Sequence, residues 1–256
     1  MIHTDTLLIG IITKNVIQYL DGLFNNIEKY IYCEKKDGSL DDKPSLLFKN
    51  YKVLFVDGNS DDGTYEKCLD FCNKDLNNRK VMKQLNCYLP RPLSLEQARN
   101  MYIEYFEKYF NKDVFLLILD ADDVNSKPIV DMSGFLSCFN YNNWDFMGGN
   151  QSDKYYDIWT LRSKECPYDC WEMVRKTGNM DYVNKHHIHI PKNNPLIEVD
   201  SAFGGIGIYH TEKLKGLKYK VFREDDYIEQ CEHVGLNKSL QQKGGKLYIN
   251  PAFINF

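Results

Sequence analysis

The stretch Val114–Asp123, VFLLILDADD, decides the fold of this 256-residue chain. Its first six residues, Val114–Leu119, form a continuous apolar run, which is typical of a β-strand covered on both faces. Carboxylates follow at once, at Asp120, Asp122 and Asp123. Functional groups of α/β proteins collect where parallel strands end. The stretch therefore predicts a buried parallel strand that delivers acidic side chains to a functional edge of a sheet.

The residues upstream repeat an alternation of buried strand and amphipathic helix. Strands are predicted at Leu7–Ile12, Tyr51–Val56 and Val81–Leu85, and helices at Ile17–Ile31, from Tyr65 to Cys72, and at Leu93–Phe110. Strands that alternate with helices favour βαβ units and a parallel sheet. We therefore expect an α/β fold, with a Rossmann-like, mostly parallel central sheet flanked by helices, in a single domain over residues 1–256.

The second half of the chain has a less regular pattern. Its predicted elements are strands at Trp144–Gly149, Glu198–Tyr209 and Lys246–Ile254, helices at Cys166–Lys176 and Glu229–Gln242, and a long loop at Gly178–Pro195. Within the second of these strands, Gly204 and Gly205 indicate a close approach of backbones.

Composition excludes several classes of protein. Lys and Arg total 32 against 36 Asp and Glu, and no segment is densely basic, so nucleic-acid binding is disfavoured. The longest aliphatic run, Leu7–Ile12, is far shorter than the roughly 20 residues of a membrane helix, so we expect no integral membrane segment. The eight cysteines are scattered in a chain that needs no disulfide framework, which predicts reduced thiols and a cytoplasmic location.

The acidic cluster at Asp120, Asp122 and Asp123 has two interpretations. Crowded carboxylates repel one another unless a cation lies among them, and hard oxygen ligands suit Mg²⁺ or Mn²⁺. The alternative is an acidic helix N-cap, since Ser126 and Pro128 follow closely. The residues alone leave both open.

The segment Asp57–Thr64, DGNSDDGT, is a second polar turn at the end of a buried strand. It precedes a helix whose first amides are free, so the turn can hold a nucleotide. The alternative is an ordinary loop in which Asp61 or Asp62 caps the helix. The segment lacks the spacing of GxGxxG and Walker A loops, which argues against a Rossmann dehydrogenase and a P-loop enzyme.

Four motifs together resemble the GT-A glycosyltransferases, especially the family 2 type. They are Ile9–Asn15 (IGIITKN), Val56–Thr64 (VDGNSDDGT), Ala98–Asn100 (ARN) and Leu119–Asp123 (LDADD), in the family's order and approximate spacing. The resemblance covers about the first 125 residues. It implies a GT-A fold in which residues 1–125 bind a nucleotide sugar and residues 126–256 bind an acceptor.

The resemblance also implies roles for particular residues. Its donor site comprises Thr13, Asn15, Asp57, Arg99, Asp120, Ala121 and Asp122. Thr13 and Asp57 would lie near the base and ribose, and Arg99 near the nucleotide. Asp120 and Asp122 correspond to the DxD motif, whose Mn²⁺ or Mg²⁺ binds the diphosphate. Many relatives carry an acidic residue that contacts the base where this chain has Gly58, and this departure leaves the identity of the nucleotide open. The resemblance favours a UDP-sugar and also allows a GDP-sugar.

The second half resembles a narrower set of viral and microbial glycosyltransferases of unassigned substrate. The matching segments are Tyr156–Arg162, Phe203–Tyr209 and Cys231–Val234. We assign the acceptor site to Trp159, Arg162, Gly204 and Gly205, with Trp159 stacking on an acceptor ring and Arg162 holding a polar group. The alternative for these two side chains is core packing and a surface charge.

The catalytic base is ambiguous in the sequence. Cys231–Val234 opens a helix where family 2 enzymes carry an acidic pair, and His233 replaces the second carboxylate. The candidates are Glu232, His233, Asp225 and Asp226. Because neighbouring helical residues lie about 100° apart, we expect only one of Glu232 and His233 to face the site. We assign acceptor contact to Glu232, and proton transfer or metal contact to His233. The alternative for His233 is an ordinary, partly buried histidine.

A zinc site is a weaker interpretation of the histidines in the predicted long loop. His186, His187 and His189 follow Cys166 and Cys170, but the spacing lacks the CxxC pairs of common zinc modules. A loop that orders over the substrate is favoured instead.

The predicted function is metal-dependent transfer of a sugar from a nucleoside diphosphate sugar to a hydroxyl of a glycan or other acceptor, with inversion implied by the resemblance. A nucleotidyltransferase that makes nucleotide sugars is one alternative. Such enzymes usually carry a Gly-rich, basic loop where this chain has Thr13–Val16. A non-catalytic nucleotide-sugar or glycan-binding module is another. The sequence leaves the oligomeric state open.

Overall fold

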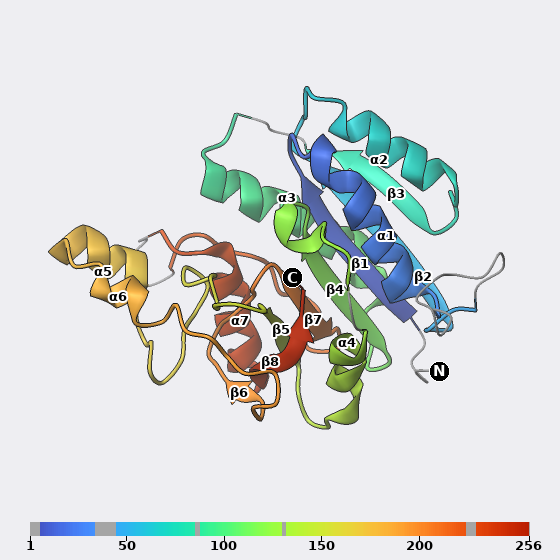
Figure 1. The fold of residues 1–256 in the computed structure, drawn as a ribbon. Coiled ribbons are helices and arrows are strands. Elements are labelled where there is room, and N and C mark those ends of the chain that lie inside the picture. Colours follow the sequence, from blue (N-terminus) through green and yellow to red (C-terminus); the bar gives the residue numbers. More distant parts are fainter. Residues whose placement is uncertain (1–5, 34–44, 85–87, 130–131, 224–228, 256) are drawn as a thin grey trace.

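The computed structural model describes residues 6–33, 45–84, 88–129, 132–223 and 229–255 (Figure 1). Its first four strands are β1 (Thr6–Thr13), β2 (Asn50–Asp57), β3 (Arg79–Lys83) and β4 (Val114–Asp120). They lie in the order β3-β2-β1-β4 and are all parallel. In this register Thr13 pairs with Asp57, and Ile12 pairs with Asp120. The predicted donor residues therefore meet at one edge of the sheet, because parallel strands end at the same edge.

The second half of the chain extends the same sheet beyond β4. Its strands are β5 (Phe146–Asn150), β6 (Ile197–Glu198), β7 (Ile206–His210) and β8 (Leu247–Ile254). β7 runs antiparallel to both β4 and β5, β8 is parallel to β5, and β6 is antiparallel to β8. In the described residues this gives one eight-stranded sheet in the order β3-β2-β1-β4-β7-β5-β8-β6. The predicted α/β fold with a mostly parallel sheet is confirmed.

Helices cover both faces of the sheet, as Figure 1 shows. α1 (Leu20–Ile31), α2 (Thr64–Asn73) and α4 (Ser133–Ser137) pack on one face, and α3 (Arg91–Phe106) and α7 (Glu232–Gln242) pack on the other. Successive residues of β1 alternate between the two cores: Leu7 and Ile9 pack with α1 and α2, while Leu8 packs with α3. Burial on both faces explains why β1 is an unbroken apolar run.

The remaining helices are short. α5 (Cys170–Thr177) and α6 (Asp181–Asn184) form an arm that extends from the body (Figure 1). The 3-10 turns are η1 (Ile17–Tyr19), η2 (Glu107–Tyr109), η3 (Asp123–Asn125) and η4 (Cys138–Asn140). No helix in the described part of the chain is long and apolar enough to cross a membrane.

Several elements differ from the sequence-based prediction, among them the helix α4, which was not predicted. The strand expected at Glu198–Tyr209 is two strands, β6 and β7, because Gly204 and Gly205 form a turn with φ of 74° and 79°. A Cβ on Gly205 would lie 2.7 Å from Val124 Cγ2, so the turn requires glycine there. The helix expected from Cys166 begins at Cys170, since the preceding aspartate caps it, and α6 interrupts the predicted long loop.

Candidate active site

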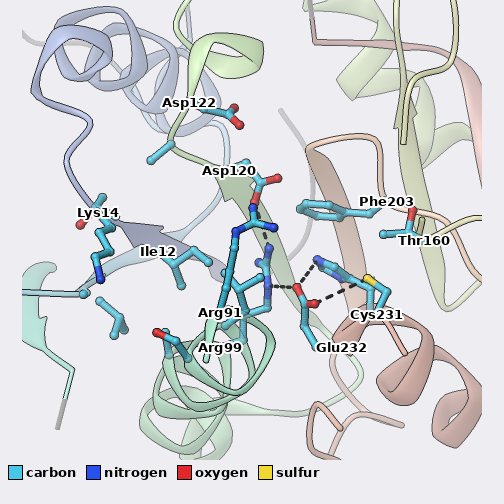
Figure 2. A pocket seen from close by; sticks show the side chains of 18 of the residues that line it. Ile12, Lys14, Arg91, Arg99, Asp120, Asp122, Thr160, Phe203, Cys231 and Glu232 are labelled. Atoms are coloured by element: carbon cyan, nitrogen blue, oxygen red, sulfur yellow. Dashed lines mark hydrogen bonds and ion pairs between the residues drawn. The ribbon is translucent and has the colours of Figure 1, made fainter. Parts of the chain in front are cut away.

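A cavity of about 630 Å³ opens at the edge where β1 and β4 end. It is bounded by the N-terminal half of α3, by the first turn of α7 and by the segment 156–160 (Figure 2). The predicted site residues that line it are Thr13, Arg99, Asp120, Ala121, Asp122, Trp159, Glu232 and His233. The structure thus gathers most of the predicted donor, acceptor and catalytic residues around one space.

Asp57 lies behind the wall of this cavity and is fully buried. Its Oδ2 accepts hydrogen bonds from Thr13 Oγ1 at 3.1 Å and Ser60 Oγ at 2.6 Å, and its Oδ1 accepts one from the Ser60 amide at 2.9 Å. Asn15, with φ of 53°, donates from its amide to Ser60 Oγ at 2.9 Å. Neither Asp57 nor Asn15 lines the cavity. In this geometry both position the loop that carries Thr13, and their direct contact with a donor stays a prediction.

The N-cap of α2 is Gly63, which has no side chain to cap the helix, and the preceding Asp62 accepts from the first amide of the helix instead. Its Oδ1 accepts from the Thr64 amide at 2.9 Å, at the start of α2, and its Oδ2 accepts from the Ile17 amide at 3.1 Å. The turn therefore joins the beginnings of two helices. Gly58, at the start of the same turn, lines the cavity, and its amide donates to the Thr13 carbonyl at 2.8 Å.

Arg99 connects the two sides of the cavity (Figure 2). Its Nη2 donates to Asp120 Oδ1 at 2.9 Å, and its Nε donates to Glu232 Oε1 at 2.8 Å. Arg99 and Glu232 are almost fully buried. Burial alone would lower the pKa of Arg99, but the surrounding negative groups, among them Asp120 and Glu232, raise it well above its ordinary value. The guanidinium therefore stays charged and compensates both carboxylates.

Among the described residues, no basic side chain forms an ion pair with Asp122. It is exposed to the cavity, and its Oδ1 accepts only a 3.3 Å hydrogen bond from the Val124 amide among the described residues, at the start of η3. Desolvation and then the negative charge of Asp120 raise the pKa of Asp122 above its ordinary value. The N-cap interpretation is therefore confirmed, and it does not neutralise the charge. Asp120 and Asp122 fit a divalent cation, because hard carboxylate oxygens and an uncompensated negative charge are what Mg²⁺ or Mn²⁺ prefers.

His233 is almost fully buried at the opposite side of the cavity. Its ring stacks on Phe203, with centroids 3.9 Å apart and planes 22° apart. Neither ring nitrogen has a hydrogen-bond partner among the described residues, and Nε2 lies 3.8 Å from Glu232 Oε1. Burial and the charge of Arg99 hold the pKa of His233 well below its ordinary value. The imidazole is therefore neutral at pH 7.

Two expectations about His233 are wrong. We expected only one of Glu232 and His233 to face the site, but the cavity extends around the first turn of α7 and both side chains line it. We also expected His233 to join Asp120 and Asp122 as a metal ligand. Those three are not among the described side chains whose ligand atoms lie within 4.8 Å of one another. The charge of Arg99, which disfavours a proton on His233, equally disfavours a second cation there.

Part of the predicted acceptor site lies elsewhere. Arg162 does not line the cavity, because its Nη2 donates to Asp169 Oδ2 at 2.6 Å and its Nη1 donates to main-chain carbonyls. Gly204 and Gly205 are not in the cavity wall either. The Gly205 carbonyl instead accepts from the Asp120 amide at 2.9 Å, so this turn supports the acidic loop. The remaining base candidates, Asp225 and Asp226, lie outside the described residues.

Sequence reasoning missed several residues that line the cavity. They include Lys14, Gln84, Arg91, Tyr156, Asp157, Thr160 and Phe203. Asp157 Oδ2 accepts from the Gly204 amide at 3.0 Å, and burial raises the pKa of Asp157 to about 6. The sequence signal for Asp157 is its place in the Tyr156–Arg162 segment, beside the predicted acceptor residue Trp159. Nothing in the sequence pattern distinguishes Lys14 or Arg91 from other surface cations.

The histidines of the arm separate into two groups. His187 Nε2 lies 3.2 Å from the Tyr156 carbonyl oxygen, and His189 Nδ1 lies 2.6 Å from that of Asp153. His186 instead lies beside the Cys166 and Cys170 thiols. The weaker zinc interpretation thus gains a geometry that the sequence spacing did not suggest.

Comparison with solved structures confirms the GT-A fold. TarS residues 1–349 from S. aureus superpose with a TM-score of 0.51 at 14% identity, over 95% of this chain and 57% of that one. The mannosyltransferase PcManGT from Pyrobaculum calidifontis, in complex with GDP-Man and Mn²⁺, gives 0.52 at 11% identity, over 98% and 56%. GalNAc-T7 with UDP, GalNAc and Mn²⁺ gives 0.51 at 14% identity, over 97% and 43%. This chain therefore spans about half the length of these structures.

Sequence comparison gives no further information on the family. No protein-family model matches the chain. No curated protein matches it either. The likeness to the solved glycosyltransferases is therefore one of fold.

Proposed function

We propose that this protein is a metal-dependent glycosyltransferase that moves a sugar from a nucleoside diphosphate sugar to a hydroxyl acceptor, with inversion at the anomeric carbon. One observation carries the proposal. Asp120 and Asp122, at the end of β4, lie across a cavity of about 630 Å³ from Glu232 and His233. A cation-binding carboxylate pair that faces a neutral imidazole suits the departure of a diphosphate and the activation of a hydroxyl.

The donor would occupy the half of the cavity formed by residues 1–125. The Thr13 end of β1 and the Gly58 turn offer a place for the base and ribose, and Lys14 and Arg91 add positive charge for phosphate oxygens. Asp120 and Asp122 would hold Mn²⁺ or Mg²⁺, which neutralises charge on a leaving diphosphate. A UDP-sugar is favoured and a GDP-sugar is the other candidate, because similar folds have been solved with UDP and with GDP-Man.

The acceptor would enter from the half formed by residues 126–256, beside Trp159. Its hydroxyl oxygen attacks the anomeric carbon of the donor, the bond from that carbon to the diphosphate oxygen breaks, and the hydroxyl proton passes to a base. We assign the proton to His233, whose neutral imidazole has an unpartnered acceptor nitrogen among the described residues. Glu232 Oε1 lies 3.8 Å from His233 Nε2, and its negative charge would favour the imidazolium that forms, against the opposing charge of Arg99.

A donor screen tests this function. Purified protein is incubated with UDP- and GDP-sugars, with and without Mn²⁺, and nucleoside diphosphate release is measured. We expect release from one class of donor, dependent on the metal. Release of pyrophosphate from a nucleoside triphosphate and a sugar phosphate would identify a nucleotidyltransferase instead. Tight binding of a nucleotide sugar without any turnover, in the presence of candidate acceptors, would identify a binding module.

A further inference from the structure

A second cluster of metal-ligating side chains lies in the arm, outside the cavity just described. It consists of Cys166, Cys170 and His186, whose ligand atoms all lie within 4.8 Å of one another. In the described part of the chain this is the one such group of three. Both thiols are fully buried, and His186 is partly buried. The topology creates the cluster: Cys170 opens α5, and α6 turns the chain back so that His186 faces the thiols.

We propose that Cys166, Cys170 and His186 form a zinc site that fastens the arm to the body of the protein. Thiolate sulfur and imidazole nitrogen are the ligands that Zn²⁺ prefers, and three protein ligands with a water complete a tetrahedron. This pairing of soft ligands also distinguishes the site from the carboxylate pair, which suits Mn²⁺ or Mg²⁺.

The geometry is close to what zinc requires. The two sulfur atoms are 3.3 Å apart. In a tetrahedral site with bonds of about 2.3 Å they would be about 3.8 Å apart, so each moves by a few tenths of an ångström. The ligand atom of His186 lies within 4.8 Å of both sulfur atoms, and in a tetrahedral site it would lie about 3.5 Å from each. Side-chain rotation can supply movements of this size, because His186 is not fully packed.

A partner outside the cluster holds the histidine in place. The Tyr168 hydroxyl lies 3.1 Å from His186 Nε2. Coordination through Nδ1 would leave Nε2 to donate to this hydroxyl, which is the outer-shell arrangement that orients metal-binding histidines. Lys185 Nζ lies 5.2 Å from the centre of the Tyr168 ring and restricts the tyrosine further.

The position of the cluster explains what the metal would do. The segment from Arg162 to Asp169 connects to the body through the Arg162 amide, which donates to the Ser201 carbonyl at 2.8 Å. α5 and α6 extend beyond this segment (Figure 1). A zinc ion shared by Cys166, ahead of α5, and His186, after α6, would close the arm into a loop. Zinc would therefore protect the arm from local unfolding.

Zinc content and a cobalt spectrum test the proposal directly. We expect protein purified with reduced thiols to carry about one equivalent of zinc by elemental analysis. Cobalt should replace it and show thiolate-to-cobalt charge-transfer absorption. Cys166→Ser and His186→Ala should each weaken zinc binding by about 100-fold or more, measured by competition with a chromophoric chelator. Because His186 is only partly buried, His186→Ala should fold even if the cysteine variant does not.

Matched variants serve as controls. Cys33→Ser and His189→Ala change a cysteine and a histidine outside the cluster and should keep both zinc and the cobalt spectrum. Asp122→Asn should also keep them, which separates this site from the proposed transferase metal. Chelation should expose α5 and α6 to limited proteolysis while the rest of the chain stays resistant. Three results would overturn the proposal. They are purified protein that has reduced thiols but no zinc, a disulfide between Cys166 and Cys170 instead of a bound metal, and unchanged zinc affinity in His186→Ala.

Discussion

Arg99 Nε donates a hydrogen bond to Glu232 Oε1 at 2.8 Å and so links α3 to α7, although the two residues are 133 positions apart in the sequence. The same guanidinium binds Asp120 at the end of β4. One buried cation thus holds Asp120, the carboxylate on the proposed metal side, and Glu232, the carboxylate on the proposed acceptor side, at a fixed separation. The site is assembled by tertiary structure, because α3 and α7 pack on the same face of the sheet.

Loss of Arg99 should destabilise the fold. Its ion pair with Glu232 has side chains that are only 4% and 3% exposed, so Arg99→Ala leaves a buried carboxylate without compensation. We expect a loss of about 3–5 kcal/mol in the free energy of unfolding, measured with urea. Lys218→Ala, which removes an exposed ion pair with Glu104, should cost about 1 kcal/mol or less. Equal losses in the two variants would contradict the structural role of Arg99.

His233 should matter for transfer and much less for donor binding. His233→Ala should lower the rate of sugar transfer by about 10²-fold or more, the usual scale of a lost general base. The affinity for a nucleoside diphosphate, measured by calorimetry, should stay within a few-fold of the wild-type value. Glu232→Gln should mainly raise the acceptor KM. If His233→Ala transfers sugar normally and Asp157→Asn does not, the base is Asp157, and our assignment is wrong.

The raised pKa of Asp157 predicts that the stability of the fold depends on pH. Burial raises its pKa in the folded state to about 6, from an ordinary value of 3.8. The folded protein therefore holds this proton more tightly than the unfolded chain, and stability falls as the pH rises from 3.8 to 6. Asp157→Asn removes the charge and keeps an oxygen for the Gly204 amide. It should raise the free energy of unfolding at pH 8 by about 1–3 kcal/mol.

The same variant supplies its own control at low pH. Below the ordinary pKa of an aspartate the wild-type carboxyl is neutral in both states, so wild type and Asp157→Asn should unfold at nearly the same urea concentration. A gain that persists unchanged into that range would show that the effect of the substitution is not electrostatic.

Asp57 should support nucleotide binding by holding the loop beside the cavity in place. Asp57→Ala leaves Thr13 Oγ1 and the Ser60 amide without their acceptor, and the loop beside the cavity loses its anchor. We expect the affinity for UDP or GDP to weaken by about 1–3 kcal/mol in calorimetry. Asp61→Ala, at an exposed position of the same turn, should bind as the wild type does. Unchanged affinity in Asp57→Ala would mean that the turn does not serve the nucleotide.

The first half of the chain could be predicted from its sequence because local signals and the fold agree there. The apolar runs of β1 and β4 mark strands buried on both faces, and the acidic residues after β4 mark the functional edge. The second half depends on long-range contacts. The pairing of Arg162 with Asp169 and the burial of Asp157 follow from how distant segments pack, which no periodic pattern records.

The cysteine and histidine cluster illustrates the same limit. The spacing of Cys166, Cys170 and His186 matches no common zinc module, so the sequence argued against a metal there. The four-residue helix α6, too short to give a periodic signal, reverses the chain and brings His186 to the thiols. Which side chains of the arm come close together is decided by its turns and helix caps, and the residue preferences of turns and caps are weaker than those of strands and helices.

The most direct test of the proposed activity compares two adjacent carboxylates. Asp122 lines the cavity, whereas Asp123 is exposed outside its wall. With the donor found by screening, Mn²⁺-dependent release of nucleoside diphosphate should be lost in Asp122→Asn and kept in Asp123→Asn, with both variants folded by circular dichroism. Full, Mn²⁺-responsive release by Asp122→Asn would contradict the assignment of Asp122 to the metal and diphosphate, and with it the proposed mechanism.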